Sequence, residues 1–416
     1  MANKLIVLMV DGVSAEHYAL DHGRFPHFAA LEKHGFRVER LKSEVLGTSL
    51  PGRTSMLTGA TADISGVYAN KIWDGERFRY ANPDDVRVPT LPARAKEAGL
   101  DVAILGFGMI QPESASLFHA PWWTGAFIQR ARDAAPEPAE AAWLRVATHQ
   151  PGERFAAACA AAGIPSEFPK IDAATPEGRM LYGIVADHMI ADWVGAVAAS
   201  EDAPDLIMAE FLSTDSIQHA SGYRHDLSHW ITAQADLALG KIMQRLRLAG
   251  TLDQWNFAVM SDHGHSAVTQ SLHPSVIVPG VRTQCEGGSL LVAPRTPEEL
   301  AHVTEQLAAY GVEPYPNTCI PPEYREQVFV FVAPDGISFE DDNPNETETT
   351  GAPGSPSTHG MKPGMPGDDR YALFMGPNVP TGAIASGTAT QVAPTLAALL
   401  GLDISHYAAA PLFMTR

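Results

Sequence analysis

Short apolar runs alternate along the chain with longer segments whose apolar residues recur at helical spacing. This alternation is typical of a mostly parallel sheet covered by helices on both faces, because strands buried on both sides are apolar throughout. The predicted strands span residues 4–10, 101–106, 205–211, 256–261 and 371–376. The predicted helices span residues 25–35, 90–99, 178–200, 225–249 and 390–400. The pattern therefore predicts an α/β fold in one large domain over residues 1–416.

Two stretches interrupt this alternation. Residues 109–177 are rich in Ala and Pro, and we expect them to form a helical insertion. Residues 271–365 contain strand patterns at 289–293 and 328–332, with a helical segment at 297–309 between them. We expect this second stretch to form a small α+β subdomain.

The charge and cysteine content exclude several classes of partner. The chain carries 29 Lys and Arg against 48 Asp and Glu, which gives a net charge of −19. Because a negative field repels nucleic acids and anionic lipids, we expect neither nucleic acid nor a membrane as a partner. No apolar run approaches the roughly 20 residues that span a bilayer. Three scattered cysteines without a CxxC pair, and the lack of a recognisable leader, predict a cytoplasmic protein.

Candidate metal ligands follow the predicted strands. They are Asp and His residues, and the set comprises Asp11, Asp215, His219, Asp262, His263 and His359. Because binding sites in α/β sheets gather at the carboxyl ends of the strands, we expect these side chains to lie close together. Carboxylate and imidazole ligands favour zinc or a similar first-row metal over calcium. Taken singly, each residue has a simpler explanation, such as a helix cap or a surface pair, so the prediction rests on the combination.

Ser49 is a candidate nucleophile, and Thr48 beside it has the same chemistry. Residues 51–58 can form a helix with Pro51 in its first turn and Gly59 at its end. A phosphoryl group beside Ser49 would meet the free N–H groups and the positive dipole end of this helix. Two cations about 4 Å apart can clamp an oxyanion, and a hydroxyl bound to such a cation ionises readily.

Together these motifs resemble the alkaline phosphatase superfamily, and most closely its type I phosphodiesterase/nucleotide pyrophosphatase branch. Ser49 to Gly59 is similar to the nucleophile helix of that branch, including the closing Thr-Gly. The ligand motifs follow in the family order, as Val10-Asp11-Gly12, Asp215-Ser-Ile-Gln-His219, Ser261-Asp262-His263-Gly264 and Thr358-His359-Gly360. Residues 65–74 resemble a segment whose asparagine contacts a phosphoryl oxygen in relatives, and this resemblance nominates Asn70.

The resemblance implies an alkaline-phosphatase-like fold and two divalent metal ions. Zinc is favoured because three of the ligands are histidines, with manganese or iron as alternatives. The ligands fall into two sets, Asp215, His219 and His359, and Asp11, Asp262 and His263, with the Ser49 oxygen shared between them. Asn70 is expected to contact the phosphoryl group, and Arg53 is a further candidate for contact with the substrate.

Two departures from the family pattern keep other activities open. The branch usually has threonine where Ser49 stands, and Ser49-x-Pro51-x-Arg53 is also the serine form of the sulfatase signature. In that signature the first residue is oxidised to formylglycine, so a sulfatase or a phosphonate monoester hydrolase is one alternative. Two complete ligand sets argue against it, since formylglycine enzymes use one metal. Phosphomonoesterases, phosphonoacetate hydrolases and phosphomutases of the superfamily are further alternatives.

We therefore expect a metal-dependent hydrolase of phosphoric esters, most similar to phosphodiesterases. Its substrate would be a small-molecule phosphoester, and the reaction would pass through a phospho-enzyme at Ser49.

Overall fold

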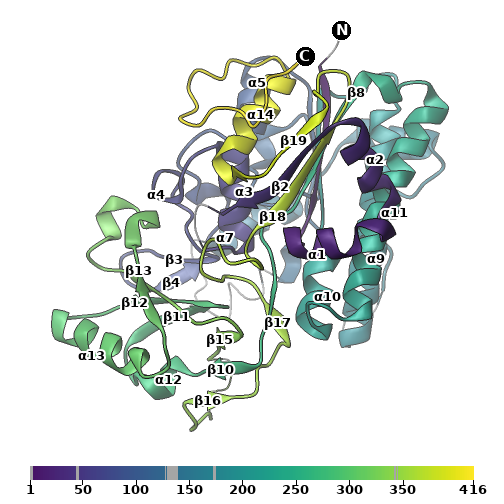
Figure 1. Cartoon of the computed structure of the whole chain (residues 1–416). Coiled ribbons are helices and arrows are strands. Elements are labelled where there is room, and N and C mark those ends of the chain that lie inside the picture. Colours follow the sequence, from purple (N-terminus) through teal and green to yellow (C-terminus); the bar gives the residue numbers. More distant parts are fainter. Residues whose placement is uncertain are drawn as a thin grey trace.

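In the computed structural model, nine strands of the described chain form a central sheet (Figure 1). The described residues are 3–43, 46–126, 128, 139–171, 175–341, 343 and 345–416. The strand order is β19-β2-β18-β8-β1-β7-β5-β6, with β20 beside β2. The strands are β1 (Lys4–Val10), β2 (Phe36–Lys42), β5 (Val102–Leu105), β6 (Leu117–His119), β7 (Leu206–Phe211), β8 (Trp255–Met260), β18 (Arg370–Met375), β19 (Gly382–Ile384) and β20 (Gly387–Thr388).

The central strands run parallel, as the sequence predicts. Strands β8, β1, β7, β5 and β6 form consecutive parallel pairs. Strand β18 is antiparallel to both of its neighbours, β8 and β2. All five predicted strands lie within one residue of their expected bounds, so the mostly parallel α/β sheet is confirmed.

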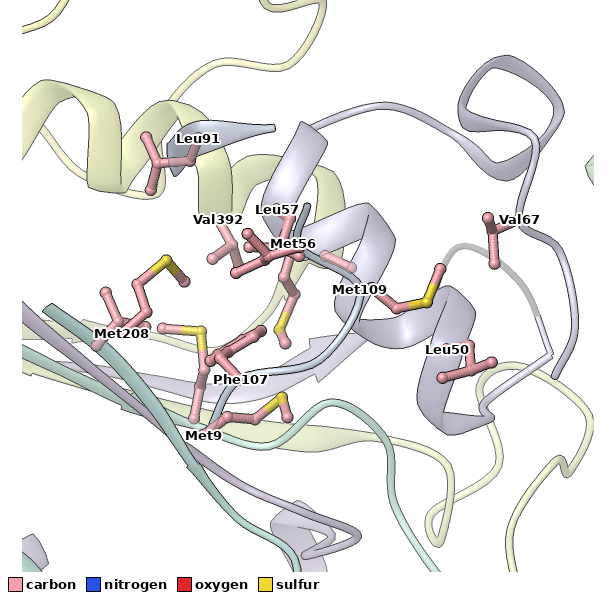
Figure 2. Packing of buried hydrophobic residues seen from close by; sticks show 14 of the residues in the cluster. Met9, Leu50, Met56, Leu57, Val67, Leu91, Phe107, Met109, Met208 and Val392 are labelled. Atoms are coloured by element: carbon pink, nitrogen blue, oxygen red, sulfur yellow. The ribbon is translucent and has the colours of Figure 1, made fainter. Parts of the chain in front are cut away.

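Both faces of the sheet are buried against helices. In β1, alternate residues belong to two separate apolar clusters, so that Met9 faces one side and Leu8 the other. The first side is covered by α3 (Ser49–Thr58), α5 (Leu91–Glu97) and α14 (Val392–Leu399). The second side is covered by α2 (Pro26–His34), α9 (Pro176–Ala198) and α11 (Asp226–Ala249). Figure 2 shows how Met56 and Leu57 of α3 pack onto the sheet beside Phe107.

Several elements were absent from the prediction. Helices α1 (Ala15–Asp21) and α10 (Ser213–Ser221) are short and largely polar, so their periodicity is weak. Strand β2 alternates apolar and charged residues and lies toward the edge of the sheet. The shorter elements are α4 (Ala62–Ser65), the β3 (Lys71–Trp73) and β4 (Phe78–Tyr80) hairpin, and α12 (Pro274–Ile277).

The stretch 109–177 is not helical throughout. Its described part contains α7 (Ala139–Thr148) and α8 (Glu153–Ala161), but β6 pairs with β5 and extends the main sheet. Three residues of strand are too few to stand out in the sequence. Residues 129–138 lie outside the described residues, and an insertion over 109–177 stays a prediction.

The stretch 271–365 has the predicted strand-helix-strand arrangement and a core of its own. Its antiparallel sheet has the order β11-β12-β14-β13, and α13 packs against it. The elements are β11 (Arg282–Glu286), β12 (Ser289–Ala293), α13 (Pro297–Ala308), β13 (Glu313–Tyr315) and β14 (Phe329–Val332). A three-stranded sheet adds β10 (Gln270–Leu272), β15 (Ile337–Phe339) and β16 (Thr350–Gly351), and β9 (Ser266–Ala267) pairs with β17 (Ser357–Thr358). The domain boundaries at 271 and 365 stay a prediction. Among the described residues, no helix has the length and apolar character that crossing a bilayer requires.

Candidate active site

Three neighbouring strands bring the predicted ligands to one edge of the sheet. Asp11 follows β1, and Asp262 with His263 follows β8. Strand β7 leads into α10, which carries Asp215 and His219. Because β7, β1 and β8 are adjacent and parallel, their carboxyl ends meet at the same place.

The first ligand set combines one helix and one distant loop. Asp215, His219 and His359 each offer a ligand atom, and these atoms lie within 4.8 Å of one another. His219 Nδ1 lies 3.1 Å from the backbone oxygen of Ser357. A carbonyl oxygen can only accept, so Nδ1 donates and Nε2 is the atom on the side of Asp215, 3.4 Å from its Oδ1. Burial opposes protonation of His219, but the charge of Asp215 raises its pKa, so a cation bound here would displace a proton from Nε2. Burial lowers the pKa of His359 well below its usual value, and the nearby His263 lowers it further, which keeps the ring neutral.

The second ligand set is fully buried. Asp11, Asp262 and His263 also place their ligand atoms within 4.8 Å of one another. His263 Nδ1 lies 2.8 Å from the backbone oxygen of Gly264, so Nε2 faces Asp11 Oδ1 at 3.0 Å. Burial raises the pKa of both Asp11 and Asp262 to about 7, and the charge of Asp11 adds to the rise at Asp262. A bound cation would reverse this effect, because it stabilises the ionised carboxylates.

The two sets are contiguous. The rings of His263 and His359 have centroids 4.2 Å apart, and His263 Nε2 lies 3.9 Å from Asp215 Oδ1. His265, outside the predicted ligand list, also reaches the first set with its Nε2 3.2 Å from Asp215 Oδ1. The structure thus brings all six predicted ligands together.

These residues fit two divalent cations. Asp11 Oδ1 is buried and accepts no hydrogen bond from the described residues, whereas Asp262 Oδ2 faces the guanidinium of Arg53 at 2.9 Å. Buried carboxylate oxygens without a donor are unfavourable unless a charge or a metal compensates them. The oriented lone pairs of His219 and His263 complete donor sets of nitrogen and oxygen, which suit zinc.

Ser49 is the first residue of α3 and lines the same cavity as Asp215, His219 and His359. Its Oγ is 3.0 Å from His263 Nε2. Thr48 Oγ1, in contrast, is buried and has no hydrogen-bond partner among the described residues. The helix begins two residues before the predicted start and ends, as expected, at Gly59, whose φ of 66° is left-handed.

Asn70 is held from both sides. Its Oδ1 accepts the backbone N–H of Leu50 at 2.8 Å, so this N–H of the helix start is not free for a phosphoryl oxygen. The side-chain NH₂ of Asn70 is therefore the group left to contact a substrate. The backbone N–H groups of Asn70 and Lys71 donate to the two oxygens of Glu286 at 3.0 and 2.9 Å. Glu286 ends β11 of the 271–365 region, and burial raises its pKa to about 7.

Arg53 is engaged by carboxylates rather than open to the solvent. Its side chain is 1% exposed, with Nη2 2.5 Å from Asp11 and Nη1 2.9 Å from Asp262. Its Nε lies 3.0 Å from Glu210 Oε2. One guanidinium thus faces three carboxylates, which leaves a negative excess that favours a cation. Contact between Arg53 and the substrate stays a prediction. Glu210 was missed, although a charge inside the apolar β7 segment is itself a signal.

Over residues 5–355, the sequence matches the family described as type I phosphodiesterase/nucleotide pyrophosphatase. The chain belongs to this family. It is therefore a phosphoric ester hydrolase. Among curated proteins, no sequence matches this chain.

Solved structures of family members share the fold. Human ectonucleotide pyrophosphatase/phosphodiesterase 5 is 14% identical, with a TM-score of 0.66 over 96% of this chain and 95% of that one. The murine protein is 15% identical, with a TM-score of 0.67 over 96% of each chain. An inactive form of the murine protein in complex with AMP gives the same values. At this identity the likeness shows the alkaline-phosphatase-like fold.

Two cavities flank the ligand sets of this phosphodiesterase family member. One has a volume of about 760 Å³ and is walled mainly by apolar side chains, including Trp122, Met180 and Tyr182. The other has a volume of about 520 Å³ and is polar, with Lys71 and Glu340 in its lining. Both cavities are lined by Asn70, His219 and His359, so they meet at the ligands.

One buried carboxylate joins the wall of the apolar cavity to the first ligand set. Asp187 of α9 accepts the indole N–H of Trp122 at 3.0 Å. It also accepts the backbone N–H groups of Leu212 at 3.3 Å and Ser213 at 2.9 Å, where α10 begins. Burial raises the pKa of Asp187 to about 7, and these donors oppose the rise. Trp123, in contrast, is buried and donates to Glu210.

Proposed function

We propose that the chain hydrolyses phosphodiesters by transferring the phosphoryl group first to Ser49 and then to water. In the first step, Ser49 Oγ bonds to phosphorus while the bond to the departing alcohol breaks, and that alcohol takes up a proton. In the second step, water attacks phosphorus, the Ser49–phosphorus bond breaks, and the monoester is released. The observation that carries the proposal is the position of Ser49 Oγ, 3.0 Å from His263 Nε2 of the second set and in the wall of the cavity that Asp215, His219 and His359 also line.

The residues around Ser49 have distinct tasks. Asp215, His219 and His359 would hold one divalent ion, and Asp11, Asp262 and His263 the other. Bound zinc would supply positive charge that favours ionisation of a hydroxyl and offsets the charge of the oxyanion. Asn70 donates its side-chain N–H to a phosphoryl oxygen, while Glu286 fixes the Asn70 backbone. Ser49 also stands at the positive dipole end of α3.

The two cavities suggest that each of the two ester groups on the phosphorus binds in a cavity of its own. Trp122 and Tyr182 lie edge to face, with ring centroids 5.7 Å apart, and offer apolar surface to an aromatic group. A nucleotide has such a group, and the complex of the murine relative with AMP supports this class of substrate. We therefore propose that the nucleobase of the substrate binds in the apolar cavity and the leaving alcohol in the polar cavity.

The first experiment compares kcat/KM for p-nitrophenyl thymidine monophosphate, a diester, with kcat/KM for p-nitrophenyl phosphate. Zinc-loaded enzyme should give a ratio well above one. A ratio well below one would replace the proposal with a phosphomonoesterase whose pocket accepts the dianion.

Two variants test the nucleophile. Ser49→Ala should abolish turnover, whereas Thr48→Ala should retain it, because the Thr48 side chain makes no capping hydrogen bond. Mass spectrometry of the Ser49 peptide from the native host should show unmodified serine. Formylglycine at this position would overturn the phospho-enzyme and favour the sulfatase-like alternative.

We also propose that the protein works in the cytoplasm. Cys159, Cys285 and Cys319 form no disulfide in the described part of the chain, which suits a reducing compartment. Fractionation of the native host checks this, and recovery of the enzyme outside the cytoplasmic fraction would contradict it.

A further inference from the structure

A third cluster of metal-binding side chains lies apart from the two ligand sets. His17, Asp21 and His229 each offer a ligand atom, and these atoms lie within 4.8 Å of one another. His17 and Asp21 are spaced i, i+4 on α1, so they share one face of that helix. His229 comes from the first turn of α11. A helical i, i+4 pair joined by a histidine from a distant segment is also the arrangement of the first ligand set.

The buried lone pair of His17 shares its one donor with another acceptor. His17 Nδ1 lies 3.2 Å from the backbone oxygen of Tyr223, so this nitrogen donates and Nε2 carries the lone pair. Thr232 Oγ1 is 3.3 Å from Nε2 and 2.9 Å from the backbone oxygen of Ser228, so its single hydrogen can serve only one of these two acceptors at a time. His17 is 1% exposed, so water does not reach the lone pair. Burial lowers the pKa of His17 to about 4, which keeps the ring in the neutral form that binds metals.

The other two side chains of the cluster face each other. Asp21 Oδ2 and His229 Nδ1 form a buried ion-pair contact, and neither atom has another hydrogen-bond partner among the described residues. The rings of His17 and His229 have centroids 4.8 Å apart. The side chains of Asp21 and His229 are 12% and 14% exposed, which leaves a route for a cation and a water ligand from the solvent. Arg24 is largely exposed and lies 3.6 Å from the other Asp21 oxygen.

We propose that His17, Asp21 and His229 bind a third divalent cation, for which two imidazoles and one carboxylate favour zinc. This cation would tie α1 to α11. Helix α1 follows the loop that carries Asp11, and the Tyr223 carbonyl that orients His17 follows α10 with its ligand His219. The site therefore supports elements that deliver ligands to the active site. It does not depend on which phosphoric ester is hydrolysed.

Metal counting on the intact protein tests the proposal. Zinc per chain is measured after gel filtration for the wild type, for His229→Ala and for a matched control, His302→Ala, which removes an exposed histidine of α13. We expect His229→Ala to lose one equivalent relative to both other proteins. Its Tm should also stop responding to added zinc at concentrations that still stabilise the control. Equal zinc contents in all three proteins would overturn the site.

A second measurement does not depend on any variant. Anomalous scattering at the zinc edge from wild-type crystals grown with zinc should show a peak within about 2.0–2.2 Å of ligand atoms of His17, Asp21 and His229. If anomalous peaks appear only at the two active-site ligand sets, the proposal is refuted, and Asp21 and His229 form only an ion pair. Retained diesterase activity would show that such a result leaves the proposed reaction intact.

Discussion

Replacement of Arg53 by methionine distinguishes a role in stabilising the fold from a role in binding the substrate. Methionine keeps most of the apolar volume but removes the charge that faces Asp11, Asp262 and Glu210. If the guanidinium serves mainly to hold these carboxylates, their buried charges lose their partner and the folded state is destabilised. If it serves mainly to bind the substrate, the fold is unaffected and KM rises.

The contacts allow the size of the effect to be estimated. Removal of one partner from a buried ion pair costs about 3–5 kcal/mol of folding free energy. Unfolding entropy is about 2.1 cal/mol/K per residue, so a chain of 416 residues loses ~1 °C of Tm for each kcal/mol. We therefore expect Arg53→Met to lower the Tm by about 3–6 °C in a thermal scan followed by circular dichroism. Arg53→Lys should fall between it and the wild type, because lysine keeps the charge without the planar fork.

Arg295→Met is the matched control. Arg295 is exposed and pairs with Glu299 at 3.1 Å on the surface, so its loss should change the stability by less than about 1 kcal/mol. If the Tm of Arg53→Met equals that of the control while its KM for the nitrophenyl diester rises, the reasoning above is refuted. Arg53 would then be a substrate-binding residue.

Three further predictions concern residues around the site. Glu286→Gln replaces one acceptor oxygen by an NH₂ group that faces the backbone N–H of Asn70 or of its neighbour. Loss of one such charge-assisted hydrogen bond costs about 1.5–3 kcal/mol and should lower kcat by ~10-fold or more, with a smaller change in KM. An unchanged kcat would show that Glu286 does not position Asn70. Asp187 has a folded pKa near 7, above its usual 3.8, so only the native state keeps this proton between about pH 4 and 7. The contribution of Asp187 to the free energy of unfolding therefore falls as pH rises through this window, by at most ~4 kcal/mol. Urea unfolding at pH 5 and pH 7.5 measures this fall in the wild type. The Asp187→Asn variant has no carboxyl to titrate at this position, so its stability should not show the fall. Trp122→Ala should raise KM for the thymidine diester by ~3–10-fold more than for bis(p-nitrophenyl) phosphate, and equal increases would argue against a nucleobase in the apolar cavity.

The features that the sequence predicted are those that a local pattern of residues reveals, whereas the missed features depend on how distant segments pack together or have no regular pattern. Strand β1 is recognisable because it is apolar on both faces, and Asp11 is recognisable because it follows that strand. The direction of β18 is not contained in its apolar run, since an antiparallel buried strand has the same composition as a parallel one. Helix α10 carries two ligands, yet its polar sequence gives it little periodicity. Ligand motifs could thus be located while the element that bears them was not.

The supporting residues were missed for a different reason. Glu210, Asp187 and Glu286 each lie in a different element from the residue they hold, so only the folded chain brings the partners together. Each is a carboxylate buried at a cost in desolvation, and hydrophobic residues of similar size would often be at least as stable at such positions. Their common feature is that each fixes a group beside the reaction centre: Arg53, the start of α10, or Asn70. Their cost in stability is therefore best explained by the geometry that they impose on the ligands and on Ser49.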